Sequence, residues 1–400
     1  MKILHTADWH LRDRDIEECS ACLSFLVETA EAEAVNLVVI AGDIFHSQDV
    51  KDDSASTRLA FKTVSALADI APVAIVLGTP SHDGKAPEIL RFAKGKFDIH
   101  VSSIPEQIYL EDGFFFDRPA GDREPDAVLS MIPTITKQYF QTVSGIAGAD
   151  QEIGAAMSGL FLGFGAQAEY KAAHILVGHW NVNGCRLANG QIRTGMDIEV
   201  SVDQMNLSQC DIGLLGHIHA SQVLGGKYYY SGPIYSTKID EVGPMGFWVH
   251  LINEWDEQQP SGSRFIETPC RRTVRVVADL TPDLTETEKS DLYYHGHEDN
   301  IDGASVRIDL TVWQDETGSY DKKLIEEHYL SLGALSVDVR ITPIPRVTVR
   351  AAAVLEAGRL RAKVAKRAEL NGDILDAETL DMCDSLEDMT GEEILKGVTA

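Results

Sequence analysis

The hydrophobic positions of this chain form short apolar runs that alternate with longer segments of helical character. Six runs have the pattern of buried strands, because few polar residues interrupt them. They occupy residues 3–4, 37–40, 73–77, 127–132, 175–177 and 212–215. Helices are predicted at 16–34 and 54–71, the first with apolar residues three and four positions apart, and a loosely packed Gly- and Ala-rich helix at 151–173. This alternation predicts an α/β domain over residues 1–255, with helices covering the sheets.

The pattern changes after residue 255. Strands are predicted at 273–280, 304–313 and 335–341, and helices at 285–294 and 321–332. The β-α-β-α-β order predicts a small α+β domain over residues 256–345.

The last segment, residues 346–400, divides by charge. Its first part is basic and amphipathic, with apolar positions that include Leu355, Leu360 and Val364. Asn371 and Gly372 predict a helix stop, and the remainder is acidic. Such charge runs usually mean a helical hairpin with solvated faces, and the alternative is a docking segment for a partner protein. We favour docking, because the segment lies outside both predicted domains and exposes apolar residues.

Composition predicts a cytoplasmic enzyme that does not enter a membrane. The 400 residues are 44% hydrophobic, enough for a large core, and no run is long enough to span a bilayer. No signal-peptide segment precedes the first strand, and six scattered cysteines fit a reducing compartment. The net charge of −27 argues against tight binding to long DNA by this chain alone. It does not argue against cleavage, because bound cations attract phosphate locally.

Polar residues with metal-ligand chemistry stand just past the ends of the predicted strands. They are Asp8 and His10, Asp43, His82 and Asp83, His179, and His217 and His219. Strand ends converge where an α/β sheet builds its site, and residues two apart in an extended segment point the same way. Oxygen and imidazole donors without thiolates suit Mn²⁺, Fe²⁺ or Zn²⁺. The ligands outnumber the needs of one ion, which predicts two ions and hydrolysis at phosphorus.

Each of these residues taken alone has an ordinary explanation. A single histidine is usually a surface or core residue, and a pair such as Gly42-Asp43 often caps a helix. Five such motifs in this order favour a metal site instead.

The order D-x-H, G-D, H-D, G-H, G-H-x-H resembles the calcineurin-like metallophosphoesterases. Three stretches narrow the resemblance to the SbcD family, the nuclease subunits of DNA double-strand-break repair complexes. They are HTADWHL at 5–11, AGDIFH at 41–46 and LGHIH at 215–219. The resemblance covers roughly residues 1–250. It implies a layered two-sheet sandwich flanked by helices, a DNA-positioning cap at 256–345 and a helical tail at 346–400 that binds a partner ATPase.

The resemblance also implies roles for the site residues. Asp43 would bridge two ions, of which one is completed by Asp8, His10 and His219, and the other by Ser81, His179 and His217. His82 would contact the scissile phosphate and protonate the leaving oxygen, with Asp83 orienting it. His46 would help to place the DNA strand, although a solvent-facing loop residue explains it nearly as well. Ser81 stands where the family has an asparagine, so the second ion is expected to bind more weakly or through water.

The expected cofactors are two divalent metal ions, with Mn²⁺ favoured and Mg²⁺, Fe²⁺ or Zn²⁺ also compatible. The expected partners are DNA and an SMC-like coiled-coil ATPase of the SbcC type, with a homodimer of this chain inside a heterotetramer. The implied activities are 3′→5′ exonuclease action on duplex ends and endonuclease action on single strands or hairpins. Two alternatives remain: a stand-alone phosphatase or cyclic-nucleotide phosphodiesterase of the same superfamily, and a structural subunit with an incomplete metal site.

Overall fold

The computed structural model describes most of the chain. The described residues are 1–119, 123–134, 150–167, 171–187, 199–238, 241, 243–252, 262–294, 301–346, 354, 356–387 and 389. The chain forms two compact units. One comprises Met1–Leu310 with Asp321–Ile341, and the other Thr311–Tyr320 with Thr342–Ala400. The domain boundaries expected near 255 and 345 therefore stay predictions.

The first sheet has six strands in the order β15-β14-β1-β2-β3-β4. They are β1 (Lys2–Thr6), β2 (Leu37–Ala41), β3 (Val73–Val76), β4 (Ile99–Ser102), β14 (Gly246–Leu251) and β15 (Gly262–Glu267). Strands β1 to β4 are parallel, whereas β14 and β15 are antiparallel additions beside β1. Two helices, α1 (Ile16–Ala32) and α2 (Ala55–Ile70), connect the parallel strands, and short 3-10 segments lie at Asp13–Asp15 and Ala86–Phe92. The strands predicted at 3–4, 37–40 and 73–77 and the helices predicted at 16–34 and 54–71 are confirmed.

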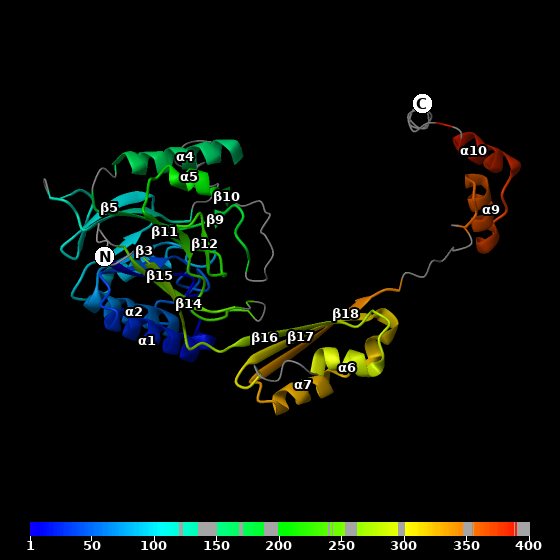
Figure 1. The fold of residues 1–400 in the computed structure, drawn as a ribbon, viewed down its shortest axis with the longest axis horizontal. Helices are drawn as coiled ribbons and strands as arrows, with labels where there is room; N and C mark the ends of the chain where they lie inside the picture. The colour runs from blue at the N-terminus through cyan, green and yellow to red at the C-terminus, as the bar shows by residue number, and fades with distance from the viewer. Residues whose placement is uncertain are drawn as a thin grey trace. The chain divides into compact units, whose positions relative to one another are not determined.

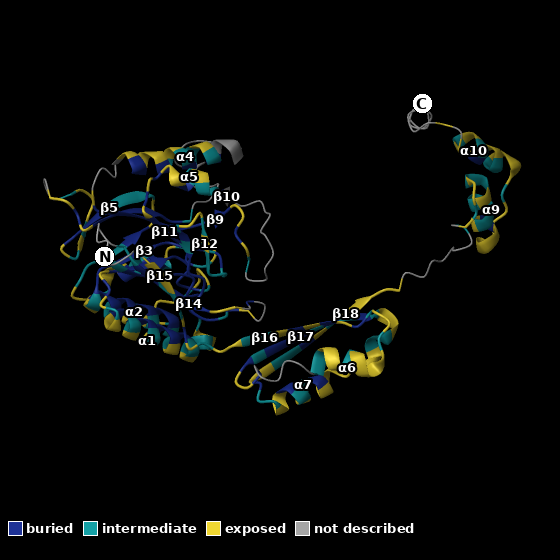
Figure 2. Cartoon of the chain, in the orientation of Figure 1, coloured by how far each residue is buried: buried dark blue, intermediate teal, exposed yellow. Residues whose placement is uncertain are grey.

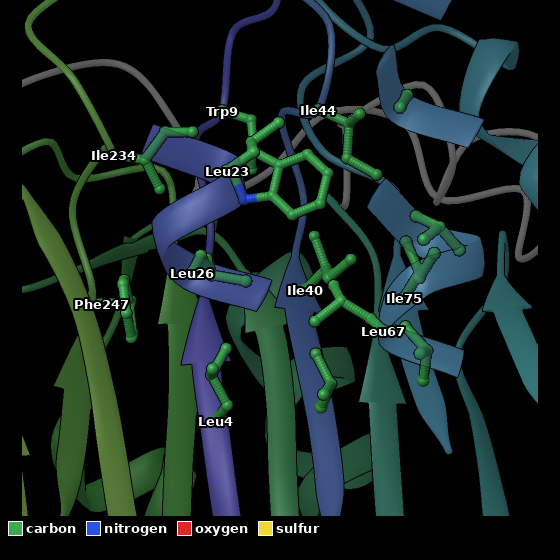
Figure 3. Packing of buried hydrophobic residues seen from close by; sticks show 14 of the residues in the cluster. Leu4, Trp9, Leu23, Leu26, Ile40, Ile44, Leu67, Ile75, Ile234 and Phe247 are labelled. Carbon is green, nitrogen blue, oxygen red and sulfur yellow. The ribbon is translucent and has the colours of Figure 1, made fainter. Parts of the chain in front are cut away.

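Alternate residues of these strands face the helices. Leu4, Ile40 and Ile75 pack with Leu23 and Leu67 of the helices, as Figure 3 shows. The largest side chain of this layer is Trp9, which is fully buried although it lies between two ligand-type residues. Trp9 therefore anchors the loop after β1 in the core, and its neighbours on the chain are left to face the opposite side.

The second sheet has seven strands in the order β12-β13-β11-β8-β7-β5-β6. They are β5 (Glu106–Glu111), β6 (Phe114–Phe116), β7 (Ala127–Ile132), β8 (Ala173–His179), β11 (Ile212–Gly216), β12 (Gln222–Leu224) and β13 (Tyr228–Tyr230). A small pair, β9 (Asn181–Val182) and β10 (Glu199–Val200), follows β8. Helices α4 (Asp150–Gln167) and α5 (Val202–Asn206) cover this sheet through a separate apolar cluster.

The two sheets pack face to face. Ile3, Val39 and Val76 of the first sheet share one core with Val177 and Leu214 of the second. Helices α1 and α2 lie on one side of the stacked sheets, and α4 and α5 lie on the other (Figure 1). The strands hold most of the buried positions, and the helices expose their outer faces (Figure 2). The α/β, two-sheet sandwich flanked by helices is therefore confirmed.

The elements predicted beyond residue 255 also form. The three-stranded sheet β16-β17-β18 consists of Thr273–Asp279, Ser305–Trp313 and Ser336–Ile344. Helices α6 (Glu286–Tyr294) and α7 (Lys322–Ser331) alternate with these strands, and a 3-10 segment spans Gln314–Ser319. Buried alternate residues such as Val276, Ile308 and Tyr329 supply its core.

The C-terminal segment contains two helices, α9 (Leu360–Asn371) and α10 (Ala377–Glu387), which contact each other. Gly372 ends α9 with a left-handed φ of 76°, which agrees with the predicted helix stop. Arg361 of α9 pairs with Asp381 and Asp384 of α10. Some of the basic charge of α9 is therefore neutralised by acidic residues of α10. Leu360 and Val364 are half-buried, and Leu355 lies outside the described residues.

Candidate metal centre

The loops that follow the strands adopt an unusual backbone conformation at the predicted ligands. Asp8, His10 and Asp43 have φ values of 52°, 42° and 51°, and His217 has 92°. Left-handed φ at a residue other than glycine costs on the order of 1–3 kcal/mol and persists where surrounding structure imposes it. Two hydrogen bonds impose it here, from Asp8 N to Gly42 O at 2.9 Å and from His10 N to Asp43 O at 3.0 Å. The loops after β1 and β2 therefore run side by side and turn their ligand-type residues together.

Glycines allow the remaining strands to approach. A Cβ atom on Gly42 would lie 2.4 Å from His179 Nδ1, and one on Gly78 would lie 2.1 Å from Asp43 N. Strand register contributes as well, because the pairing of β11 with β8 sets Gly216 opposite His179. Side chains from five strand ends thus reach one place in the fold.

Asp43 lies between the histidines of this place. Its Oδ2 atom is 3.3 Å from His179 Nε2 and 3.8 Å from His10 Nε2, and the side chain is almost fully buried. The other ring nitrogen of His179, Nδ1, contacts Ala41 O at 2.7 Å and can donate to it. That contact leaves Nε2 facing the carboxylate, and a cation that displaced the Nε2 proton would be bound by both groups.

Two groups of ligand atoms overlap at Asp8. Asp8, His10 and His219 form one group and Asp8, Asp43 and His179 form the other, with the ligand atoms of each group within 4.8 Å of one another. The Nε2 atoms of His10 and His219 are only 2.9 Å apart, so they must share either a proton or a cation. Asp8 is itself held by the backbone N–H of His217 at 3.0 Å. The His217 ring lies 5.2 Å from that of His179, centroid to centroid.

Burial and charge act against each other in this cluster. Burial raises the pKa of Asp8 to about 6. Burial alone would also raise the pKa of Asp43, but His179 and His10 beside it hold that pKa well below its usual range. Burial alone would lower the pKa of His179, whereas the Asp43 carboxylate raises it to about 9. Buried carboxylates that lie this close gain most from a bound cation, so the donor set and its charge fit divalent metal ions.

The third motif departs from the sequence-based expectation. Ser81 is exposed, and its carbonyl accepts a hydrogen bond from Gln48 N at 3.2 Å. Thr79 lies at the ligands instead, with its Oγ1 3.2 Å from Asp43 Oδ2 and 3.3 Å from His179 Nε2. The ligand role of Ser81 therefore stays a prediction, and Thr79 is the neutral oxygen donor that the structure brings to Asp43 and His179. Thr79 directly follows Gly78 at the end of its strand, as Asp43 follows Gly42, and that parallel was the available signal in the sequence.

His82 and Asp83, the histidine and carboxylate of the same motif, have different partners in the structure. His82 Nδ1 contacts the carbonyl of His46 at 2.8 Å, and its ring lies 4.7 Å from that of His10. Asp83 is fully buried and accepts hydrogen bonds from Gly78 N at 2.8 Å and Phe45 N at 3.0 Å. The expectation that Asp83 orients His82 is therefore wrong, because its carboxylate joins two loops. Burial raises the pKa of Asp83 to about 7.

His46 lies beside the rings of His10 and His82. Nitrogen atoms of His10, His46 and His82 fall within 4.8 Å of one another, and the rings of His46 and His82 are half-buried at the edge of the cluster. The structure therefore brings together His10, His46 and His82 on one side and His179 and His217 on the other.

Glu241 belongs to the site and was not expected. Its Oε1 lies 2.5 Å from His219 Nδ1, and it is 4% exposed. Glu241 stands 22 positions beyond His219, in a segment without strand or helix pattern, so the sequence carried no signal for it.

The pattern of one protein family matches residues 1–220, more than half of the chain, and its description is Calcineurin-like phosphoesterase. The chain belongs to this family. Membership implies divalent metal ions, and the ligand groups around Asp8 and Asp43 have the chemistry to hold them.

Curated relatives are named as the SbcD component of the nuclease SbcCD. The protein of Escherichia coli K12 is 25% identical over 273 residues, which cover 63% of this chain and 64% of that protein. The chain thus matches just under two thirds of that relative's length. The protein of Staphylococcus epidermidis is 23% identical over 313 residues, covering 74% and 78%. That of Staphylococcus saprophyticus is 24% identical over 307 residues, covering 74% and 77%.

A solved structure, GAP50 of Plasmodium, superposes with a TM-score of 0.42 at 11% identity, over 86% of this chain and 98% of that one. At that score the fold assignment rests on the family match. In the part of the chain that the structure describes, no helix has the length and apolar character to cross a membrane.

Proposed function

We propose that this chain is a metal-dependent DNA nuclease, the nuclease subunit of a two-component complex that processes DNA ends. The observation that carries the proposal is the pair of ligand groups that share Asp8, one with His10 and His219 and the other with Asp43 and His179. The Oδ2 atom of Asp43 also faces His10 of the first group. Two adjacent divalent cations suit the displacement at a phosphodiester, in which both the attacking and the leaving oxygen carry charge. The relatives named as nuclease components support DNA as the substrate.

The ligand set divides between two cation positions. Asp8, His10 and His219 are assigned to the first position, and Asp43, His179, His217 and Thr79 to the second, which Asp8 also reaches. Asp43 reaches both, since its Oδ2 faces His10 and His179. When bound, the cations neutralise the phosphate and activate water. Mn²⁺ is the favoured cofactor, because the donors are carboxylate, hydroxyl and imidazole groups.

His82 is the proposed general acid. Its Nδ1–H donates to the His46 carbonyl, which fixes the ring and leaves Nε2 available for a proton that passes to the leaving oxygen. This backbone contact does for His82 what Asp83 was expected to do. His46 lies beside His82, where it can contact the strand that enters the site.

The net negative charge of the chain supports a partner that binds the DNA. A chain with a net charge of −27 repels the DNA backbone outside the metal centre, so a second subunit must hold the duplex. We infer that this subunit is an SMC-like coiled-coil ATPase of the SbcC type and that α9 and α10 form its docking segment. A homodimer of this chain within a heterotetramer, acting in the cytoplasm as a 3′→5′ exonuclease and a single-strand or hairpin endonuclease, completes the proposal.

The test is a substrate panel with the purified full-length chain and Mn²⁺. The panel contains end-labelled duplex DNA, single-stranded DNA, a DNA hairpin, a phosphomonoester and cyclic AMP. The proposal predicts cleavage of the DNA substrates, with stimulation by the ATPase and little turnover of the others. Preferential hydrolysis of the phosphomonoester or of cyclic AMP would instead make the chain a phosphatase or a cyclic-nucleotide phosphodiesterase. Binding of the ATPase without any hydrolysis would make it a structural subunit.

A further inference from the structure

Glu241 is a buried carboxylate that lies outside the two cation-ligand groups. Its Oε2 accepts hydrogen bonds from Thr237 N at 2.7 Å and Lys238 N at 3.1 Å, and Thr237 Oγ1 lies 3.0 Å from both carboxylate oxygens. These donors hold the carboxylate in place. Its Oε1 is thereby presented to His219 Nδ1 at 2.5 Å.

The two ligand groups contain three histidines, His10, His179 and His219. These three rings differ in what holds Nδ1, the nitrogen that faces away from the ligand atoms. His10 Nδ1 is buried and has no hydrogen-bond partner among the described residues. His179 Nδ1 meets a main-chain carbonyl, that of Ala41. Of these three rings, His219 is the one whose Nδ1 meets a carboxylate, that of Glu241.

This contact decides which nitrogen of His219 can bind a cation. Donation of Nδ1–H to Glu241 fixes the tautomer in which Nε2 carries the lone pair. That lone pair faces His10 Nε2 across 2.9 Å, where the first cation position lies. A carboxylate behind a ligand imidazole also makes the ring a stronger donor, and its loss typically weakens metal binding by about 10- to 100-fold.

We propose that Glu241 is a positioning residue that sets the affinity of the first cation position, formed by Asp8, His10 and His219, without setting that of the second. The second position is independent of Glu241, because the Ala41 carbonyl orients His179. The inference rests on the two-cation part of the proposed function and not on DNA as the substrate.

The experiment is a Mn²⁺ titration of the metal-free, full-length chain by calorimetry, with no substrate present. The wild-type chain should show two binding events. Glu241→Gln keeps the size of the side chain but removes its charge, and should weaken one event by about 10-fold or more while the other stays within about twofold. Thr237→Val leaves Glu241 in place but removes a hydroxyl donor, and should produce a smaller loss at the same event.

Glu18→Gln is the matched control. Glu18 pairs with Arg271 at 2.7 Å and belongs to none of the ligand groups, so this variant should bind Mn²⁺ as the wild type does. Thermal unfolding of each metal-free variant reports folding, and the milder Thr237→Val replaces Glu241→Gln if the latter does not fold.

Two results would overturn the inference alone. One is a Glu241→Gln chain that binds both cations with wild-type affinity, and the other is an equal loss at both events, which indicates a general structural role. A wild-type chain that binds no Mn²⁺ would overturn the proposed function and this inference together.

Discussion

The Thr79 hydroxyl lies 3.2 Å from Asp43 Oδ2, the oxygen that also lies 3.3 Å from His179 Nε2. This relationship places a neutral oxygen donor where a cation between the carboxylate and the imidazole would find it. Thr79→Val keeps the shape of the side chain and removes that donor. Because one polar contact to a charged group contributes about 1.5–3 kcal/mol, Mn²⁺ binding at one event should weaken by about tenfold or more.

Exposed Ser81 supplies the control for that prediction. Ser81→Ala should leave the Mn²⁺ titration unchanged, as should Ser81→Asn, which restores the residue type that the resemblance led us to expect. A loss of Mn²⁺ affinity in Ser81→Ala that matched the loss in Thr79→Val would return the ligand role to Ser81.

His82 should affect the rate and not the metal content. His82→Ala removes the proposed general acid, so Mn²⁺-dependent DNA cleavage should fall by roughly 100-fold or more. Calorimetry on the same sample should show two Mn²⁺ events with near wild-type affinities. If the variant lost bound metal in proportion to activity, His82 would be a ligand, as its place in the group with His10 and His46 also permits.

The buried histidines between the sheets should make the fold sensitive to acid. Burial lowers the pKa of His250 to about 3, and its ring stacks on that of His5 at 5.7 Å. The folded state therefore binds fewer protons than the unfolded state between pH 6.5 and 3. The free energy of unfolding consequently has its full value above pH 6.5 and falls as the pH drops below that. One such group contributes a loss of about 2 kcal/mol between pH 6.5 and 5.

Urea denaturation of the metal-free chain at these two pH values measures the effect. His250→Phe should reduce the loss of unfolding free energy by about that amount. Tyr229→Phe alters a ring that contacts His250 but leaves the imidazole in place, and it should leave the pH dependence unchanged. A His250→Phe chain with the wild-type pH dependence would contradict the assignment.

The C-terminal segment should be required for the partner and dispensable for chemistry. A chain that ends at residue 345 should still cleave short single strands with Mn²⁺ but should not co-purify with the ATPase. Leu360→Glu and Leu355→Glu should have the same effect as the truncation, since buried apolar anchors carry most binding energy. Lys363→Ala should weaken the complex only slightly. A truncated chain that retained the ATPase would move the interface away from α9 and α10.

The pattern of the sequence predicted the α/β domain and the convergence of its ligands for one physical reason, whereas the two-sheet sandwich was implied by the family resemblance. Buried parallel strands read as apolar runs, and a polar residue directly after such a run can lie only at the sheet edge. The register of β1 with β2 and of β8 with β11 then brings Asp8, Asp43, His179 and His217 together.

Loop conformation and distant partners could not be predicted in this way. The Thr79 carbonyl accepts the backbone N–H groups of His82 and Asp83, and this turn leaves Ser81 at the surface. The residue type alone could not tell which of the two hydroxyl side chains faced the carboxylate. Asp83 and Glu241 act through contacts with loops that are remote in sequence, and no periodic pattern marks such contacts.

We propose that Asp43 joins two cations for phosphodiester hydrolysis, and a cleavage assay on three chains tests this role. It compares Mn²⁺-dependent cleavage of end-labelled DNA by the wild-type chain, by Asp43→Ala and by Asp49→Ala, in which a nearby exposed carboxylate is removed. We expect product from the wild type and from Asp49→Ala, and none from Asp43→Ala, although that variant remains folded. Near-normal cleavage by Asp43→Ala would show that Asp43 does not join the cations.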